Sequence, residues 1–353
     1  MKKLVSLLMA LCMMVSLAAC GGQEQTTDEG GAESDNGGYK IAFSNSYVGN
    51  AWRTAAVNIF DAYTADLVEQ GVLSKAYSSS AGDDVQAQIN EIRNMMSEGY
   101  DAIVCIAASA TGLQSVLEEA AERGIVVVCF DTTVDSDLVY NVNTDQFEYG
   151  RLLAQSLADR MGGEGNILWI KGIEGNQVTL DRTEGMQSVL DNYPGIKVLG
   201  DGYGKWDDST TASVMSNLMS AYASQGIDGI LSEGGGGHAI VQSLVENGID
   251  PATVPISEGE MFNSFMKDWV EMDLDAFCTA QPPYLAAAAV DVALKVLNGE
   301  EVEPMTYVDL PTCSSKEEAE EKWYQPDQEG GFVCDWTDNN NTWNLTIEDV
   351  APN

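Results

Sequence analysis

Short apolar stretches alternate with helical patterns from residue 39 to about residue 300, and this alternation leaves the chain very few possible folds. In its first part, apolar stretches at 41–43, 102–107 and 125–130 are separated by segments whose apolar residues recur at helical spacing. Near-continuous apolar strands between helices are typical of a parallel sheet that helices cover on both faces. The chain is therefore predicted to belong to the α/β class.

The same alternation restarts near residue 166. Strands are predicted at 166–170, 196–199, 227–231, 254–257 and 276–279, and helices at 178–193, 210–225, 239–247 and 284–297. A chain of 353 residues, 44% of them hydrophobic, is long enough for two domains that each bury a core. We therefore expect two doubly wound parallel-sheet lobes that face each other across a cleft.

The first 38 residues are expected to lie outside this fold. Lys2 and Lys3 precede an apolar stretch at 4–17, which is too short for a transmembrane helix and ends in Leu-Ala-Ala-Cys-Gly. This pattern resembles a bacterial lipoprotein signal peptide (residues 1–20), which would make Cys20 the lipid-modified first residue of the mature protein. The alternative is an ordinary secretory signal. Residues 21–38 hold no apolar side chain larger than Ala, so a flexible tether is expected there.

The composition argues against several partners and cofactors. Asp and Glu number 55 against 17 Lys and Arg, and the resulting formal charge of −38 repels nucleic acid. Because the chain has one histidine and no Cys-x-x-Cys pair, no metal site is expected, and we predict no cofactor. No stretch after the signal reaches the roughly 18 uninterrupted apolar residues that would indicate a transmembrane helix.

The remaining cysteines fall into two groups. Cys105, Cys129 and Cys278 lie in apolar strand stretches and are expected to be small buried side chains. Cys313 and Cys334 flank a polar segment near the C-terminus, and outside the cytoplasm they are compatible with either a disulfide or two free thiols.

The tail, residues 309–353, departs from the alternation of strands and helices. We expect it to be an extension that packs on one lobe through its aromatic side chains, Trp323, Tyr324, Trp336 and Trp343.

Polar and aromatic residues follow the predicted strands, at the ends where open α/β sheets bind their ligands. The loop after the first strand contributes Asn45, Tyr47, Asn50, Trp52 and Arg53, and the later loops contribute Asp131, Thr132, Arg182, Trp206, Glu233, Glu258 and Gln281. Amide, carboxylate and guanidinium groups pair with adjacent hydroxyls, and indole rings pack on the apolar face of a sugar ring. This set suits an uncharged polyhydroxyl ligand.

Each of these residues also has a purely structural explanation. Asp131 can cap a turn, Trp52 and Trp206 can be core residues, and Arg182 can pair with neighbouring acidic side chains on a solvated helix face. The glycines at 234–237 lack the Lys-Ser/Thr ending of a phosphate-binding loop. No Gly-x-Ser-x-Gly motif and no Ser-His-Asp set is present. A carboxylate pair such as Asp131 and Glu258 could in principle hydrolyse a glycoside, but two α/β lobes behind a lipid tether do not especially favour that reaction. We predict that the protein is not an enzyme.

Residues 39–308 resemble the ribose-type periplasmic sugar-binding proteins, which are the substrate-binding components of ABC importers. Four landmarks in order carry the resemblance: Asn-Ala-Trp at 50–52, Val-Cys-Phe-Asp at 128–131, Gly-Ile-Glu-Gly at 172–175 followed by Arg182, and Ala-Gln-Pro-Pro at 280–283. The resemblance implies three crossovers between the lobes, near residues 143–145, Gln281 and Val308. It implies an N-terminal lobe of 39–143 plus 282–308 and a C-terminal lobe of 144–281 plus 309–353, which close on a sugar by hinge motion.

The resemblance also implies which residues contact the ligand. Asn50, Asp131, Arg182 and Gln281 match the family's contacts in type, and Trp52 and Trp206 take the place of its stacking aromatics. Four positions depart from the family: Arg53 replaces a second aromatic, Thr132 an arginine, Gly234 an asparagine and Glu258 a shorter aspartate. These departures argue against ribose and favour another pentose, a hexose, a polyol or an amino sugar.

The function implied is that of an extracytoplasmic lipoprotein, anchored to the bacterial cell membrane through Cys20. We expect a monomer that captures a sugar or polyol and delivers it to an ABC permease and its ATPase. Two alternatives stay open: a binding protein for a nucleoside or an autoinducer-like furanose, and a sensor that presents its ligand to a membrane receptor.

Overall fold

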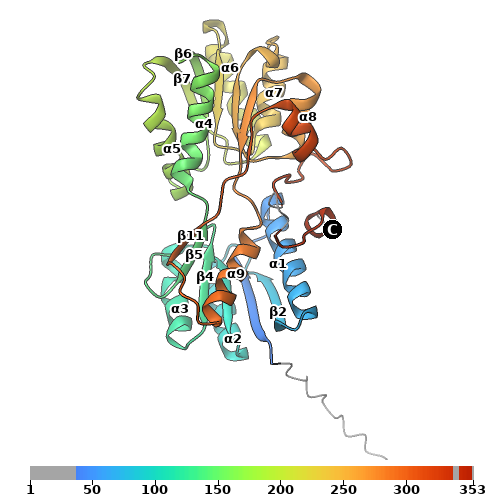
Figure 1. Ribbon diagram of the computed structural model, residues 1–353. Helices are drawn as coiled ribbons and strands as arrows, with labels where there is room; N and C mark the ends of the chain where they lie inside the picture. The colour runs from blue at the N-terminus through green and yellow to red at the C-terminus, as the bar shows by residue number, and fades with distance from the viewer. Residues whose placement is uncertain (1–36, 337–341, 352–353) are drawn as a thin grey trace, which may run out of the picture. The chain divides into compact units, whose positions relative to one another are not determined.

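The structure, a computed structural model, describes residues 37–336 and 342–351, which form two parallel-sheet lobes (Figure 1). The expected signal peptide, the lipidated Cys20 and all but the last two residues of the expected tether lie outside the described residues. No helix in the described part of the chain is both long and apolar enough to cross a membrane.

The first lobe is a six-stranded sheet in the order β11-β5-β4-β3-β1-β2, with all neighbours parallel. Its strands are β1 (Tyr39–Asn45), β2 (Leu73–Ser80), β3 (Ala102–Ile106), β4 (Val126–Phe130), β5 (Tyr140–Asn143) and β11 (Met305–Tyr307). One face of the sheet packs on α1 (Ala51–Glu69) and α9 (Leu285–Leu297), and the other on α2 (Val85–Glu98) and α3 (Ala110–Glu122). Both faces are therefore buried, as the continuous apolar strands require.

The second lobe has the strand order β12-β10-β9-β8-β6-β7. Its strands are β6 (Glu164–Lys171), β7 (Gly195–Tyr203), β8 (Gly229–Ser232), β9 (Ile256–Gly259), β10 (Ala276–Thr279) and β12 (Thr312–Cys313), of which β12 alone runs antiparallel to its neighbour. Helices α4 (Gln146–Arg160) and α5 (Gln177–Leu190) cover one face. Helices α6 (Asp208–Tyr222), α7 (Gly237–Glu246) and α8 (Asn263–Met272) cover the other.

The chain passes between the two sheets three times. The crossovers lie between β5 and α4, between β10 and α9, and between β11 and β12. This arrangement confirms the predicted fold class of two doubly wound parallel-sheet lobes with a three-segment connection.

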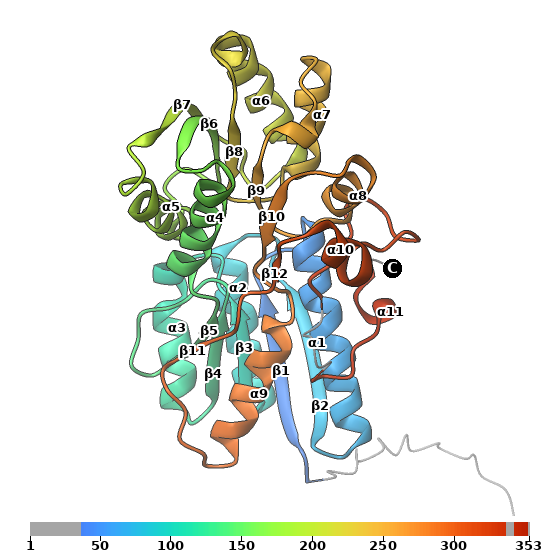
Figure 2. The same ribbon diagram turned by 45° about the horizontal axis from the view of Figure 1, so that its top comes forward.

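The described part of the C-terminal extension, residues 312–336 and 342–351, contains β12, α10 (Lys316–Glu318), the short π-helix η3 (Ala319–Trp323) and α11 (Ile347–Val350). The expectation that it packs on the second lobe alone is wrong for its last part. Figure 2 shows α10 beside α8 of the second lobe and α11 beside α1 of the first. The reason is apolar burial, because Leu345 and Val350 insert into the hydrophobic core of the first lobe.

The alternative of a disulfide between Cys313 and Cys334 is also wrong, since both thiols are free and buried. Backbone pairing holds the two cysteines in different places. Cys313 lies opposite Cys278 in the β10–β12 pair, whereas the Cys334 Sγ lies 3.5 Å from Oδ1 of Asn263. The other three cysteines in the described residues are buried, as expected from their apolar surroundings.

Candidate functional site

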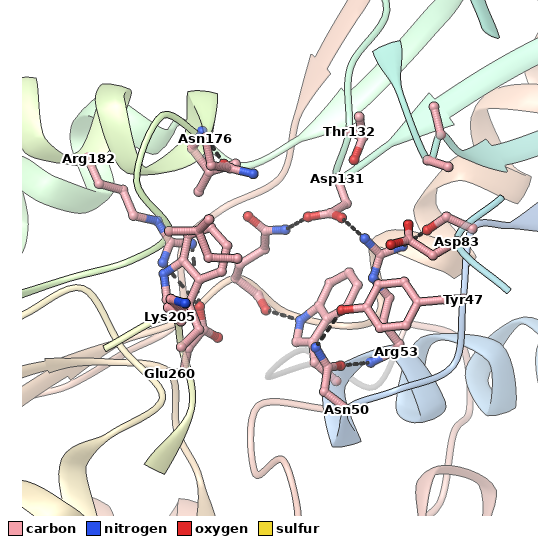
Figure 3. A pocket seen from close by; sticks show the side chains of 18 of the residues that line it. Tyr47, Asn50, Arg53, Asp83, Asp131, Thr132, Asn176, Arg182, Lys205 and Glu260 are labelled. Atoms are coloured by element: carbon pink, nitrogen blue, oxygen red, sulfur yellow. Dashed lines mark hydrogen bonds and ion pairs between the residues drawn. The ribbon is translucent and has the colours of Figure 1, made fainter. Parts of the chain in front are cut away.

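A cavity of about 420 Å³ lies among the loops that follow the strands of both lobes. Its volume falls within the range of roughly 300–1,000 Å³ that is usual for small-molecule sites. Nine of the twelve residues expected from the sequence to contact a ligand line it: Tyr47, Asn50, Trp52, Arg53, Asp131, Thr132, Arg182, Trp206 and Gln281. In Figure 3, Arg182, Lys205 and Glu260 gather on one side and Tyr47, Asn50 and Arg53 on the other, with Asp131 between them.

Arg53 belongs to the first-lobe wall, where the family resemblance placed an aromatic side chain. Its Nη2 donates to Oδ2 of Asp131 at 2.8 Å, and its Nη1 donates to Oδ1 of Asn45 at 3.2 Å. The guanidinium also lies over the rings of Tyr47, at 5.3 Å, and Trp52, at 5.7 Å. Arg53 is thus held in place by an ion pair and by contacts with two aromatic rings. An aromatic side chain at this position would also make such ring contacts.

Asp131 is held on both of its carboxylate oxygens. Oδ2 accepts from Arg53, and Oδ1 accepts from Nε2 of Gln281 at 2.6 Å. Gln281 lies in the second crossover, and its backbone carbonyl accepts from Nε1 of Trp52 at 2.6 Å. The first-lobe wall is therefore tied to a connection between the lobes.

Gln146, a residue that the sequence did not single out, continues this network into the second lobe. Its Nε2 donates to Oε1 of Gln281, and its Oε1 accepts from Nε of Arg182 at 2.8 Å. Arg182 is 2% exposed, donates to the backbone carbonyl of Glu233 at 2.8 Å, and stacks on the ring of Tyr149 at 3.6 Å. A buried amide at the start of α4 thus orients a cavity-lining arginine on α5.

Helices α4 and α5 touch backbone to backbone beside Arg182. A Cβ atom on Gly150 would lie 2.0 Å from the carbonyl oxygen of Arg182, and one on Gly185 would lie 2.0 Å from the carbonyl oxygen of Phe147. Only glycine leaves room for this approach. The close packing brings Arg182 to the depth at which it meets Gln146 and Glu260.

Glu260 and Asp83 line the cavity although the sequence did not indicate either as a ligand contact, and Glu260 has the more extensive contacts. Its Oε1 accepts from Nη1 of Arg182 at 3.3 Å and from the hydroxyl of Tyr149 at 3.1 Å. Its Oε2 is buried and has no hydrogen-bond partner among the described residues. Burial raises the pKa of Glu260, and Arg182 opposes this rise. Glu260 thus places in the cavity wall a carboxylate oxygen without a protein partner in the described part of the chain.

Glu258, which the sequence suggested as a ligand contact, lies inside the second lobe and not in the cavity wall. Glu258 lies within β9, is 1% exposed and accepts from the backbone N–H of Gly236 at 3.1 Å. It does not line the cavity, whereas Glu260, just beyond the end of the strand, does. Burial raises the pKa of Glu258 to about 8.

Asn45 and Glu233 lie behind the cavity-lining residues and form hydrogen bonds that hold the wall in place. Asn45 accepts from Arg53, as described above. The Oε2 of Glu233 accepts from the backbone N–H of Gly172 at 2.9 Å, and its Oε1 accepts from the Thr183 hydroxyl at 2.9 Å. Burial raises the pKa of Glu233 to about 7. Neither residue lines the cavity.

Left-handed backbone is concentrated in the cavity wall. Seven non-glycine residues of the described chain have positive φ, and five of these line the cavity: Asp83, Asp131, Lys205, Trp206 and Glu260, with φ between 55° and 69°. Such a conformation costs on the order of 1–3 kcal/mol at each residue and is found preferentially at functional sites. This clustering points to the cavity independently of its shape.

Within residues 37–336 and 342–351, no group of three or more His, Cys, Asp or Glu side chains is arranged to hold a metal ion.

Two doubly wound lobes, three crossovers and a polar cavity formed by loops of both lobes define a two-lobe binding protein for a small solute. Residues 41–301 match the family described as periplasmic binding protein domain, and the chain belongs to this family. The resemblance noted from the sequence is thereby confirmed.

Individual relatives are more distant. The chain is 31% identical over 172 residues to a xylitol-binding protein of Mycolicibacterium smegmatis, covering 48% of this chain and 49% of the relative. It is 30% identical over 168 residues to a multiple sugar-binding periplasmic receptor of Rhizobium radiobacter, covering 42% and 48%. The matched stretch therefore spans about half the length of these relatives. An ABC transporter solute binding protein of Thermobispora bispora has the same fold, with a TM-score of 0.73 at 20% identity over 88% of this chain and 95% of the other.

Proposed function

We propose that this protein is an extracytoplasmic binding protein of an ABC-type importer and that it binds a sugar or polyol without changing it chemically. The observation that carries the proposal is the cavity wall, in which basic and acidic side chains from both lobes neutralise one another. Arg53 pairs with Asp131, and Arg182 pairs with Glu260. A neutral ligand with many hydroxyls can use such alternating donors and acceptors without adding a net charge.

The relatives support this ligand class, since the names of the two described above mention xylitol and multiple sugars. The proposed direct contacts are Asn50, Trp52, Arg53, Asp131, Arg182, Trp206, Gln281 and Glu260, with Tyr47 and Thr132 at the margin. Because these residues come from both lobes, a ligand that touches them all favours the closed arrangement, which the three crossovers allow by hinge motion.

The family supports an extracytoplasmic location and delivery of the ligand to a permease and its ATPase. Lipid attachment at Cys20 is part of the proposal and rests on the sequence around that residue alone. It is tested by labelling expressing bacteria with a fatty acid. The lipid anchor is supported if the wild type incorporates the fatty acid and the Cys20→Ala variant does not. A wild type without label contradicts the anchor.

Titration calorimetry tests the ligand class. The panel contains xylitol, D-xylose, L-arabinose, D-fructose and myo-inositol, with a nucleoside as the non-sugar comparison. At least one neutral polyhydroxyl compound is expected to bind and to be recovered unchanged. Asp131→Ala is expected to weaken that binding about 10- to 100-fold, because it removes a charged hydrogen-bond partner worth roughly 1.5–3 kcal/mol. The control Asp137→Ala, in the exposed part of the same loop, should bind as the wild type does.

Binding of the nucleoside alone would contradict the proposal. Normal binding of the sugar by Asp131→Ala would contradict the assigned site.

A further inference from the structure

The C-terminal extension lies outside the stretch that matches the family, which ends at residue 301. Its described residues after β12 contact both lobes at places separate from the three crossovers. The function proposed above assigns it no role.

In the second lobe, the extension supports the loop that carries two cavity-lining residues, Glu260 and Phe262. The backbone N–H of Cys334 donates to the carbonyl of Met261 at 2.9 Å, and the N–H of Asn263 donates to the carbonyl of Phe332 at 2.9 Å. Phe262 and Val333 form an antiparallel bridge between these bonds. Residues 332–334 thus act as a short strand behind the cavity wall.

In the first lobe, the extension is anchored on helices α1 and α9. Val350 is 2% exposed within the first-lobe core. Nδ2 of Asn58, on α1, donates to the carbonyl of Ala351 at 3.1 Å. Nε1 of Trp343 donates to Oδ2 of Asp291, on α9, at 2.8 Å. These contacts bury apolar surface and satisfy polar groups, so they are specific anchors.

Trp336 is the residue where the two sets of contacts meet. It packs against the hydrophobic core of the first lobe and against that of the second. On α11, Ile347 also packs against the second-lobe core, while Val350 is buried in the first. Any rotation of one lobe relative to the other must break or rearrange these contacts.

We propose that the extension is an interlobe clamp, which positions the Glu260–Phe262 wall relative to the first lobe and limits how far the lobes open. Trp336 is its central positioning residue. Contacts that exist only in one arrangement of the lobes stabilise that arrangement before any ligand arrives. In the described arrangement, residues of both lobes line one cavity, so holding the lobes in that arrangement slows opening and the release of ligand.

The test compares Trp336→Ala with Tyr324→Ala in the full chain. Tyr324 is a matched control, because it is a partly buried aromatic of the same extension that packs against the second-lobe core but not against the first. Small-angle X-ray scattering without ligand is expected to give a larger radius of gyration for Trp336→Ala than for the wild type or Tyr324→Ala. Trp336→Phe, which keeps an aromatic ring, should restore most of the difference.

A second measurement uses the dissociation rate of xylitol, or of whichever panel compound binds the wild type. Trp336→Ala is expected to release it at least about 5-fold faster, with Tyr324→Ala close to the wild type. Equal radii of gyration for the two variants, or equal release rates, would overturn the clamp. The clamp rests on the proposed function only for its effect on ligand release. If no panel compound binds the wild type, the proposed function fails. The scattering comparison then still shows whether the extension holds the two lobes together.

Discussion

Gln281 donates a hydrogen bond of 2.6 Å from Nε2 to Oδ1 of Asp131, and this contact links a connection between the lobes to a cavity-lining carboxylate. The other end of the same amide accepts from Gln146, in the first turn of α4, directly after another crossover. Two of the three crossovers therefore share one buried network with the cavity. In such a network each polar group depends on its neighbours for a hydrogen-bond partner. A single substitution therefore changes the hydrogen bonding of several groups.

Gln281→Glu is expected to weaken ligand binding about 10- to 100-fold. The substitution replaces the donor that faces Asp131 with a carboxylate, which repels Asp131 and leaves its Oδ1 without a partner. Calorimetry with the ligand found in the panel measures the loss. Gln86→Glu, an identical change at an exposed position in the first turn of α2, is the control. Wild-type affinity for Gln281→Glu would show that the network does not serve binding.

Arg53→Phe is expected to change the order of preference among panel compounds. The change introduces the aromatic side chain that the family resemblance indicates at this position. It also removes the partner of Asp131 Oδ2, which can then accept a hydrogen bond from a ligand hydroxyl. Affinities for all panel compounds, measured side by side, check this prediction. The same substitution at Arg93, whose side chain is 55% exposed, should leave the order unchanged. If Arg53→Phe weakens all compounds equally, Arg53 does not determine specificity.

Gly150→Ala is expected to lower the melting temperature and to weaken binding together. The new Cβ would lie 2.0 Å from the carbonyl oxygen of Arg182, so α4 and α5 must separate and Arg182 must move. Overpacking of this kind typically costs about 1–3 kcal/mol. Calorimetric melting and ligand titration give the two effects. Gly331→Ala, where the added atom meets nothing within 4 Å, is the matched control and should change neither. A stable Gly150→Ala variant with full affinity would contradict the close packing of the two helices.

Glu258→Gln is expected to make stability less dependent on pH. The pKa of Glu258 is raised from 4.5 to about 8 in the folded protein, so between these values the native state binds more protons than the unfolded state. Stability therefore falls as the pH rises through this window, by at most about 1.4 kcal/mol per pH unit for one group. Glutamine keeps an oxygen for the Gly236 N–H and removes the titration.

Urea unfolding at pH 5, 6, 7 and 8 tests this difference. The advantage of Glu258→Gln over the wild type should grow with pH, whereas Glu246→Gln, at an exposed position, should give no such trend. Parallel curves for wild type and Glu258→Gln would show that Glu258 ionises normally.

The sequence predicted the lobes well, because their buried strands are uninterrupted apolar stretches such as β3 and β4. It missed α4, whose buried side chains occupy one face among many polar residues, and the three-residue edge strand β11. Propensity alone does not mark such elements, since their stability comes from contacts with distant parts of the chain.

The candidate site was predicted in outline for a similar reason. The ends of the strands brought Asp131, Arg182 and Gln281 together as expected, but the choice of Glu258 over Glu260 depended on where β9 stops, and strand ends are poorly determined by residue type. Gln146 carried no signal in the sequence. A glutamine at a helix start usually faces water, and only the fold reveals that this one is 7% exposed between Gln281 and Arg182.

The five left-handed residues of the cavity wall have a consequence for the energetics of recognition. The conformational cost of these residues, Asp83, Asp131, Lys205, Trp206 and Glu260, is offset during folding by burial of the large hydrophobic cores. A ligand that arrives later finds these side chains already oriented and loses little affinity to ordering them. Glycine at any of the five positions would relieve the strain and make folding easier. The same change would remove the oriented side chain. At these positions a substitution that increases the stability of the fold therefore decreases the affinity for the ligand.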